Sequence, residues 1–289
     1  MIRALIKAMR PKQWVKNVFI FAGLVFDHQL SNLPAILNTV SAFILFSLLA
    51  SSVYLINDLS DVEADRAHPK KKDRPIASGA LSVSAAWVAS IVIILLVFPL
   101  AYLLSPSFAL VCVLYFLLNL GYSNWLKHIV LLDVLILASF YVIRVVAGVT
   151  VIEVERFSPW LYQSTIFLAL FLGIGKRRAE LVLAENTGNN HRKVLDGYTL
   201  PFLDQLITIV LTITIISYSL YTFSAPNLPD NFVMMLTIPF VIYGIFRYLY
   251  LVQVKGHGEA PDEIVLSDKP FILNFLIWGV VLLVIIYSF

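Results

Sequence analysis

The chain has 289 residues, of which 60% are hydrophobic and 13% charged, with a formal net charge of +3. A soluble domain carries roughly 25% charged residues, so this composition excludes an ordinary soluble protein and predicts an integral membrane protein. The apolar runs do not alternate with polar residues as barrel strands of about ten residues would. The lone Cys112 lies within an apolar run, which excludes an intrachain disulfide.

Apolar runs of the length that crosses a bilayer, about 20 residues, recur through the whole sequence. We predict an all-α polytopic membrane protein with nine transmembrane helices, at residues 14–27, 33–57, 82–104, 107–125, 129–151, 158–176, 201–223, 231–253 and 270–288. They form a single domain, 1–289, with charged loops at 58–81, 176–200 and 254–269.

The first ten residues have the pattern of an amphipathic helix that lies on a membrane surface. The apolar face carries Ile2, Leu5, Ile6 and Met9, and the basic face carries Arg3, Lys7 and Arg10. The alternative is that these residues are a frayed start to the first span. With the N-terminus in the cytoplasm, the inner segments hold 18 of the 21 Lys and Arg residues, the bias expected of cytoplasmic loops.

The stretch "NDLSDVEADRAHPKKKDRP", residues 57–75, follows the second span and carries most of the acidic candidates. If the helix continues past Ile56, one face carries Tyr54, Asp58, Asp61 and Asp65. Carboxylates stacked on one face repel one another, and a divalent cation relieves that repulsion. Hard oxygen ligands suit Mg²⁺, which usually completes its shell with substrate phosphates. We therefore predict a magnesium site formed by Asn57, Asp58, Asp61 and Asp65, and a solvated acidic loop is the alternative.

Four cations follow in the same loop: Lys70, Lys71, Lys72 and Arg74. Anchoring of the loop at the cytoplasmic face explains Lys70 and Lys72. Cations beside a magnesium site also satisfy the phosphate oxygens that the metal leaves free. Arg74 is the preferred phosphate ligand, followed by Lys71.

Further candidates lie at the edges of spans or inside them. Lys16 opens the first span, where snorkelling to the interface is the alternative role. Asp133 and Arg144 share a helix face, but about 16 Å of axial rise separates them. Because ionisable groups at membrane depth usually face a wet interior, we expect both in one polar cavity, with Tyr122 and Lys127 at its rim.

The sequence "GKRRAEL" ends the sixth span and places Lys176, Arg177 and Glu180 within one turn. It occupies the same place in its span as the acidic cluster does in the second span. Two such helix ends facing each other would form one pocket, which the loop 254–269 would cover. The alternative is that the cations anchor this helix end at the cytoplasmic face and that Glu180 only pairs with Lys176.

These residues carry a resemblance to the UbiA superfamily of intramembrane prenyltransferases. Asn57, Asp58, Asp61 and Asp65 match its first signature, N-D-x-x-D-x-x-x-D. The resemblance implies nine helices around a central polar cavity open to the cytoplasm. The family's second motif, D-x-x-x-D, is replaced here by "KRRAE", with Lys176 and Glu180 at the acidic positions.

With "RPKQWVKN", "EADRAHP" and "YVIRVVAG", this departure resembles the branch of decaprenyl-phosphate phosphoribosyltransferases. The resemblance implies Mg²⁺-dependent transfer from phosphoribosyl diphosphate to a polyprenyl phosphate lipid, for cell-envelope arabinan precursors. It implies a bacterial or archaeal plasma membrane with the active site in the cytoplasm. Substrate contacts are expected from Lys16, Tyr54, Lys71, Arg74, Tyr122, Lys127, Arg144, Lys176, Arg177 and Glu180, and catalytic roles from Asp58, Asp61 and Asp65.

The expected partners are the bilayer and these two substrates. No nucleic-acid partner is expected, and the possibility of a homo-oligomer stays open. Three rival functions are open. The first is prenyl transfer from a prenyl diphosphate to a small or aromatic acceptor, which the altered second motif disfavours. The second is a lipid or anion transporter, for which an Asp ladder is unnecessary and broken helices are expected. The third is a membrane scaffold, which leaves the charge clusters unexplained.

Overall fold

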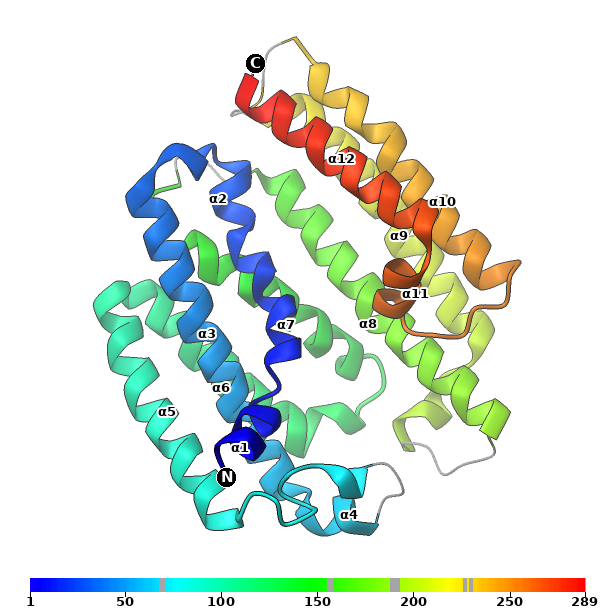
Figure 1. Ribbon diagram of the computed structural model, residues 1–289. Coiled ribbons are helices and arrows are strands. Elements are labelled where there is room, and N and C mark those ends of the chain that lie inside the picture. Colours follow the sequence, from blue (N-terminus) through cyan, green and yellow to red (C-terminus); the bar gives the residue numbers. More distant parts are fainter. Residues whose placement is uncertain (68–70, 155–157, 188–192, 226–227, 229–230, 289) are drawn as a thin grey trace. The chain divides into compact units, whose positions relative to one another are not determined.

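The computed structural model describes residues 1–67, 71–154, 158–187, 193–225, 228 and 231–288 (Figure 1). These residues form helices and connecting turns, without a strand among them. Seven described helices are long and apolar enough to cross a membrane: Leu33–Ser60, Val83–Leu104, Pro106–Asn124, Leu132–Val149, Leu200–Ser224, Val233–Gln253 and Lys269–Ser288. The predicted all-α membrane class is confirmed.

The count of nine membrane helices and the central cavity stay predictions. The first predicted span is a 3₁₀ helix, Pro11–Phe21, followed by the short α2, Ala22–Phe26. The sixth predicted span lies in α8, Pro159–Thr187, which continues well beyond residue 176.

The long helices begin where the sequence offers an oxygen to the free backbone N–H groups of a first turn. Asn32 caps α3 (Leu33–Ser60) by accepting from the N–H of Ala35 at 3.3 Å. Ser82 caps α5 (Val83–Leu104) in the same way, and Thr199 caps α9 (Leu200–Ser224). Polar residues at the ends of apolar runs therefore set these boundaries, which is why the spans could be located from the sequence.

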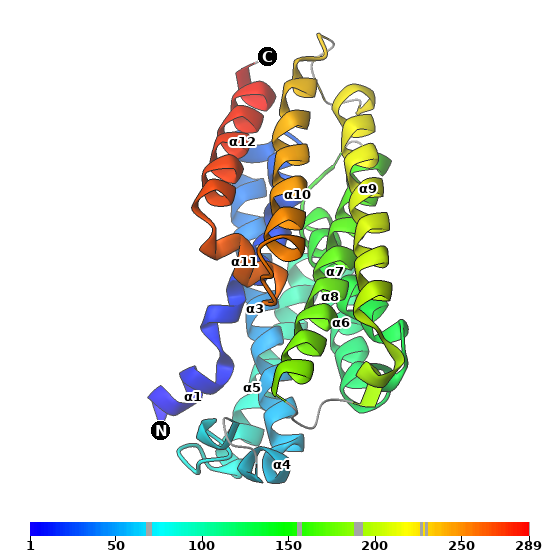
Figure 2. The same cartoon turned by 90° about the vertical axis from the view of Figure 1, so that its right-hand side faces the viewer.

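The chain divides into two compact units. Unit 1 comprises Met1–Val25, Gln29–Asn124 and Ile143–Val154. Its further helices are α1 (Ile2–Met9), α4 (Val62–Ala67), the 3₁₀ turn Lys71–Asp73, α6 (Pro106–Asn124) and the end of α7 (Leu132–Val149). In Figures 1 and 2, α1 and α4 lie at the same end of α3.

The N-terminal helix packs on unit 1 with part of its apolar face. Ala8 is buried in a cluster with Leu55, Leu59 and Ile76, and both Leu5 and Met9 pack against that cluster. Ile2 and Ile6 remain exposed. The predicted apolar face is therefore divided between protein contact and exposed surface, and its placement on a membrane stays a prediction.

Close approach of backbones fixes the end of α7 in unit 1. A Cβ atom at Gly148 would lie 1.8 Å from the carbonyl oxygen of Ile20. No side chain fits there, so the glycine lets α7 pack directly on the 3₁₀ helix Pro11–Phe21. This contact holds Asn17, on the same 3₁₀ helix, beside α7.

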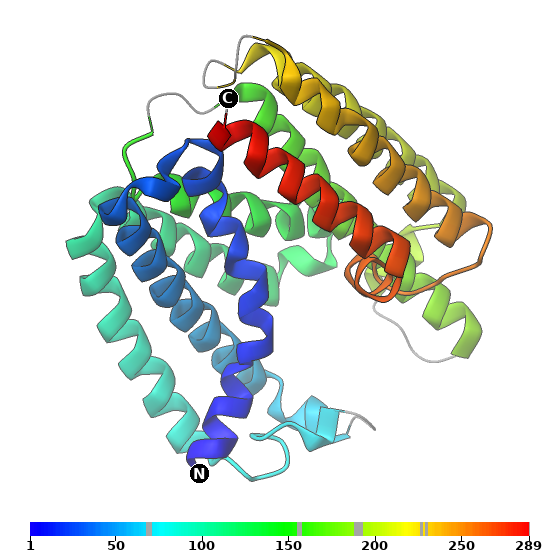
Figure 3. The same ribbon diagram turned by 45° about the horizontal axis from the view of Figure 1, so that its top comes forward.

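Unit 2 comprises Phe26–His28, Trp125–Val142 and Glu155–Phe289. Its elements include two 3₁₀ turns, Leu126–His128 and Lys193–Gly197, the 3₁₀ helix Val233–Thr237, α8, α9, α10 (Ile238–Gln253), α11 (Pro261–Ser267) and α12 (Lys269–Ser288). Helices α9, α10 and α12 run beside one another (Figure 3). Buried residues of α8, α9, α10 and α11, among them Ile174, Leu203 and Tyr248, form one core.

Candidate functional site

The helix that carries the first motif stops inside it. Helix α3 ends at Ser60, Asp61 adopts φ −96° and ψ 7°, and α4 begins at Val62. The assumption that one helix continues through Asp65 therefore does not hold. The signal missed is that six residues from Asn57 to Val62 include Asn, Ser and two Asp, whose side chains compete for backbone hydrogen bonds.

The break brings Asp58 and Asp65 together on one cation. Nη1 of Arg74 donates to Oδ1 of Asp58 at 3.1 Å and to Oδ2 of Asp65 at 2.7 Å. Lys71 Nζ lies 4.0 Å from Oδ1 of Asp65. The carboxylates are almost completely buried, with 3% and 2% of their side chains exposed, whereas Arg74 is 28% exposed and Lys71 44%.

A third cation, Arg10, reaches this cluster from the end of α1. Its Nη2 donates to Oδ1 of Asp58 at 2.6 Å, and its guanidinium lies over the ring of Tyr54, 5.0 Å from the centroid. Sequence reasoning placed Arg10 on the basic face of a surface helix and missed this role. The available signal was Pro11, which disfavours a helical conformation at the preceding residue and so ends α1 at Met9.

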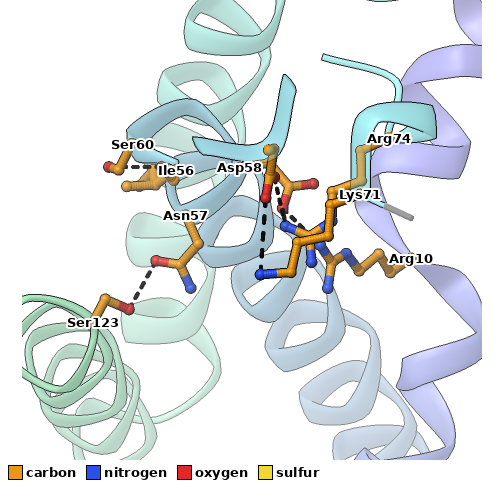
Figure 4. Close-up of polar contacts among 9 residues, drawn as sticks. Arg10, Ile56, Asn57, Asp58, Ser60, Lys71, Arg74 and Ser123 are labelled. Carbon is orange, nitrogen blue, oxygen red and sulfur yellow. Dashed lines mark hydrogen bonds and ion pairs between the residues drawn. The ribbon is translucent and has the colours of Figure 1, made fainter. Parts of the chain in front are cut away.

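Asn57 and Asp61 do not join the acidic pair. Oδ1 of Asn57 accepts from Oγ of Ser123 at 2.9 Å, on the side of α3 away from Arg74 (Figure 4). Asp61 is exposed. Within the described part of the chain, no three His, Cys, Asp or Glu residues are grouped as metal ligands.

Asp58 and Asp65 nevertheless fit a cation by donor type and spacing. Both carboxylates contact the same nitrogen of Arg74, so their oxygens converge on one cation. Oxygen donors of this kind suit Mg²⁺. A magnesium ion held by Asp58 and Asp65 would take over the charge that Arg74 neutralises here, and it would leave Arg74 to the phosphates of the substrate.

Arg144 is buried in unit 1 and is held by a neutral residue of the first predicted span. Its Nε donates to Oδ1 of Asn17 at 2.7 Å, and Nδ2 of Asn17 donates to Oγ of Ser47 at 2.9 Å. Nη2 of Arg144 lies 3.4 Å from the hydroxyl of Tyr115. Sequence reasoning did not foresee that Asn17 orients a buried arginine.

Asp133 makes its bonds elsewhere, with Arg177 of α8 in unit 2. Nε of Arg177 donates to Oδ2 of Asp133 at 2.6 Å, and the hydroxyl of Tyr198 donates to Oδ1 at 2.6 Å. Both charged side chains are fully buried. The estimate that Asp133 and Arg144 are too far apart to pair agrees with these partners, and their place in one polar cavity stays a prediction.

The same network continues to Glu180. Nη1 of Arg177 donates to Oε2 of Glu180, whose side chain is 27% exposed. The hydroxyl of Tyr198 also accepts from the N–H of Leu131 at 2.7 Å. Burial, and the hydrogen bond to Asp133, raise the pKa of Tyr198, so this hydroxyl stays protonated. Arg177 thus has no exposed surface for a phosphate, and its geometry favours holding Glu180 in place.

The remaining candidates lie in four different elements: Lys16 in the 3₁₀ helix Pro11–Phe21, Tyr122 near the end of α6, Lys127 in the 3₁₀ turn Leu126–His128, and Lys176 in α8. Lys176 is exposed on α8, and Lys16, Tyr122 and Lys127 are half-buried. Lys70 lies outside the described residues.

The loop 254–269 reaches α8 directly. Pro261 of α11 packs against Gly175 of α8, where an added Cβ atom would lie 2.2 Å from the Cγ of the proline. Ile264 of α11 is buried in the unit 2 core. The loop therefore packs beside Lys176, while the predicted covering of a pocket stays a prediction.

Comparisons with known proteins place this arrangement in a family. The family model described as the UbiA prenyltransferase family matches residues 17–264. The chain belongs to the UbiA prenyltransferase family. The decaprenyl-phosphate phosphoribosyltransferase of Corynebacterium glutamicum is 37% identical over 98% of this chain and 86% of that protein. The protein of the same name from Mycobacterium tuberculosis is 37% identical over 96% of this chain and 92% of its own.

Solved structures of UbiA proteins share the fold. A UbiA homolog from Archaeoglobus fulgidus bound to GPP and Mg²⁺ superimposes with a TM-score of 0.71 and 19% identity, over 98% of this chain and 99% of that one. A structure of digeranylgeranylglyceryl phosphate synthase gives a TM-score of 0.67 at 17% identity, over 100% of this chain and 99% of that one. At these identities the likeness supports the helical UbiA membrane fold.

Proposed function

We propose that this protein transfers the 5-phosphoribosyl group from phosphoribosyl diphosphate to a polyprenyl phosphate, and releases diphosphate. The observation that carries the proposal is 37% identity, over nearly the whole chain, to proteins named decaprenyl-phosphate phosphoribosyltransferase. The replacement of the second acidic motif by Lys176 and Glu180 supports it. The lipid product would serve as a precursor of cell-envelope arabinan.

The chemistry requires positioning and charge stabilisation rather than a general base. A phosphate monoester has a second pKa near 6, so the acceptor oxygen is already an anion at neutral pH. That oxygen forms a bond to C1 of the ribose as the bond from C1 to the diphosphate oxygen breaks, and the diphosphate leaves with the electron pair. In-line attack inverts the configuration at C1.

The acidic motif has the role of holding the leaving group. Asn57, Asp58, Asp61 and Asp65 would hold Mg²⁺, and Asp58, Asp61 and Asp65 are the residues assigned to catalysis. When bound, Mg²⁺ supplies positive charge that neutralises the diphosphate as it leaves. The N-terminus and these residues would lie on the cytoplasmic side, where a soluble donor is available.

The cations have the role of binding the other phosphate oxygens. Arg74 and Lys71 would bind the diphosphate or the 5-phosphate, since guanidinium and ammonium groups form charge-assisted bonds to phosphate. Lys16 and Arg144 are proposed for the acceptor phosphate, and Lys176 for a further phosphate oxygen. Tyr54, Tyr122, Lys127 and Glu180 would complete the contacts, with Glu180 accepting from ribose hydroxyls. Arg177 would act through Glu180.

Competition between two donors tests the function. The purified full chain is given decaprenyl phosphate, Mg²⁺ and equal amounts of radiolabelled phosphoribosyl diphosphate and an unlabelled prenyl diphosphate. We expect label in the lipid phase and diphosphate release that depends on decaprenyl phosphate. A prenylated product, or flux of the lipid across vesicles without any conversion, would assign the protein to prenyl transfer or transport instead.

Replacement of Asp61 by Asn tests the metal assignment separately. Asp61 is exposed and has no ion pair among those of the described residues, so the variant should fold normally. Loss of a ligand to a charge-neutralising ion should lower turnover at least about 100-fold. Normal turnover with an unchanged Mg²⁺ requirement would remove Asp61 from the metal site. The charge-matched control is Glu63→Gln, because Glu63 is an exposed residue of α4 close to Asp61 in the chain.

A further inference from the structure

Arg10 is the one residue of the acidic cluster that none of the proposed roles uses. It lies outside the first predicted span, at the left-handed residue that ends α1, with φ 54° and ψ 58°. A non-glycine residue in this conformation is uncommon and costs free energy, so surrounding contacts must hold it there. The side chain contacts Asp58 and the ring of Tyr54, and the backbone N–H of Arg10 donates to the carbonyl oxygen of Lys7.

The arrangement of charge around Asp58 and Asp65 is layered. The two acids are buried, while Arg10, Arg74 and Lys71 keep 32%, 28% and 44% of their side chains exposed. The three cations outnumber the two acids that they contact. Within this group of five residues, the side chains that reach solvent are therefore the cations.

The arginines also retain hydrogen-bond capacity. A guanidinium has five N–H donors. Among the described residues, Asp58 receives one bond from Arg10, and the two carboxylates share one nitrogen of Arg74. The remaining donors of both guanidiniums are available to a ligand on the exposed side, and planar guanidiniums match phosphate oxygens in pairs.

We propose that Arg10 and Arg74 form a paired-arginine phosphate site, in which buried Asp58 and Asp65 hold both guanidiniums before the donor binds (Figure 4). The ligand is a phosphate group of the donor, either its diphosphate or its 5-phosphate. This proposal rests on the proposed function and adds Arg10 to it. The N-terminal helix α1 then has a specific task, which is to deliver a substrate-binding residue to the end of α3.

The alternative is that Arg10 merely anchors α1 to α3. The anchoring role and the ligand-binding role predict different results when Arg10 is replaced and when Asp58 is replaced. Loss of Arg10 removes a group that donates to phosphate. Asp58→Asn keeps an amide oxygen that can accept from Arg10 and Arg74, and it removes a negative charge that repels an anion. Binding of inorganic diphosphate without Mg²⁺ isolates this effect from the metal.

The test uses the detergent-solubilised full chain and calorimetric titration with inorganic diphosphate and, in a second arm, ribose 5-phosphate. Arg10→Gly removes the guanidinium and keeps the left-handed backbone, which glycine adopts readily. We expect it to weaken binding at least about tenfold, and Asp58→Asn to keep or strengthen binding. Lys7→Ala is the control, because it removes one charge from the exposed face of the same helix, and it should bind as the unaltered chain does.

The arms identify which phosphate uses the site. A loss confined to inorganic diphosphate assigns it to the diphosphate, and a loss confined to ribose 5-phosphate assigns it to the 5-phosphate. Equal affinities in Arg10→Gly and the unaltered chain, or equal losses in Arg10→Gly and Asp58→Asn, overturn the proposal and leave the proposed function standing. Failure of the unaltered chain to transfer phosphoribose overturns the function itself. If Arg10→Gly does not fold, Arg10→Lys gives the same comparison, since Lys keeps the charge without the paired donors.

Discussion

The charged residues of the two units are layered in opposite senses. In unit 1 the acids Asp58 and Asp65 are buried and the cations Arg10 and Arg74 lie over them, partly exposed. In unit 2 the cation Arg177 is fully buried, and an acid, Glu180, is the partly exposed end of the network. Each unit thus uses a buried charge to hold an opposite charge at its surface.

The difference indicates what each cluster can bind. Exposed guanidiniums are donors that suit phosphate oxygens, whereas an exposed carboxylate accepts hydrogen bonds and suits hydroxyl groups. In each unit, the layering separates the side chains that are exposed to a ligand from the buried residues that hold them.

The largest expected effect on stability comes from breaking the pair that is completely buried. Asp133→Ala leaves Arg177 without its buried partner and should lower the free energy of unfolding by about 3–5 kcal/mol. Asp58→Ala should cost about 1 kcal/mol or less, since Arg10 and Arg74 can take up water. Denaturation in detergent micelles measures both. A larger loss for Asp58→Ala would reverse the comparison between the units.

Replacement of Glu180 should affect stability less, but it should weaken binding of the donor substrate. Glu180→Gln keeps the shape and removes the charge, and it should raise the KM for the donor about tenfold with little change in kcat. The matched control is Asp204→Asn. Asp204 pairs with Arg178 at 2.6 Å and has a similar exposure, 32%, but it has no assigned role. Equal KM values in the two variants would show that Glu180 is only a surface ion-pair partner.

A pH-dependent effect on stability is expected at Tyr198, which ends the unit 2 network. Tyr198→Phe removes two buried hydrogen bonds and should cost about 1–2 kcal/mol near neutral pH. Because burial raises the pKa of Tyr198, the folded chain holds the phenolic proton more tightly than the unfolded chain does. The resulting stabilisation is present below the ordinary tyrosine pKa of about 10 and is lost as pH rises above it. A pH series of melting temperatures should show this loss in the unaltered chain and less of it in Tyr198→Phe.

The fold was largely accessible from the sequence because apolar length and capping residues act locally. The predicted span at residues 82–104 agrees with α5, Val83–Leu104, and that at 201–223 agrees with α9, Leu200–Ser224. The first span was harder to locate, since Pro11–Phe21 forms a 3₁₀ helix rather than a long α-helix.

The candidate residues were also accessible, but their partners were not. The sequence indicated that Asp58, Asp65 and Arg74 belong to a binding site, because charged residues clustered at the end of an apolar helix are unusual. Spacing along an assumed helix could not show that the helix ends at Ser60, nor that Arg10, 48 residues before Asp58, completes the cluster. The same limit applies to Arg177, whose burial depends on Asp133, 44 residues away.

The chemical structure of the lipid product tests the central claim most directly. The purified chain is incubated with phosphoribosyl diphosphate, decaprenyl phosphate and Mg²⁺, and the lipid is examined by mass spectrometry and ³¹P NMR. We predict one phosphodiester and one phosphomonoester per lipid, an inverted C1, and one diphosphate released for each lipid formed. A lipid that gains no ribose 5-phosphate, or that forms without diphosphate release, would contradict the account.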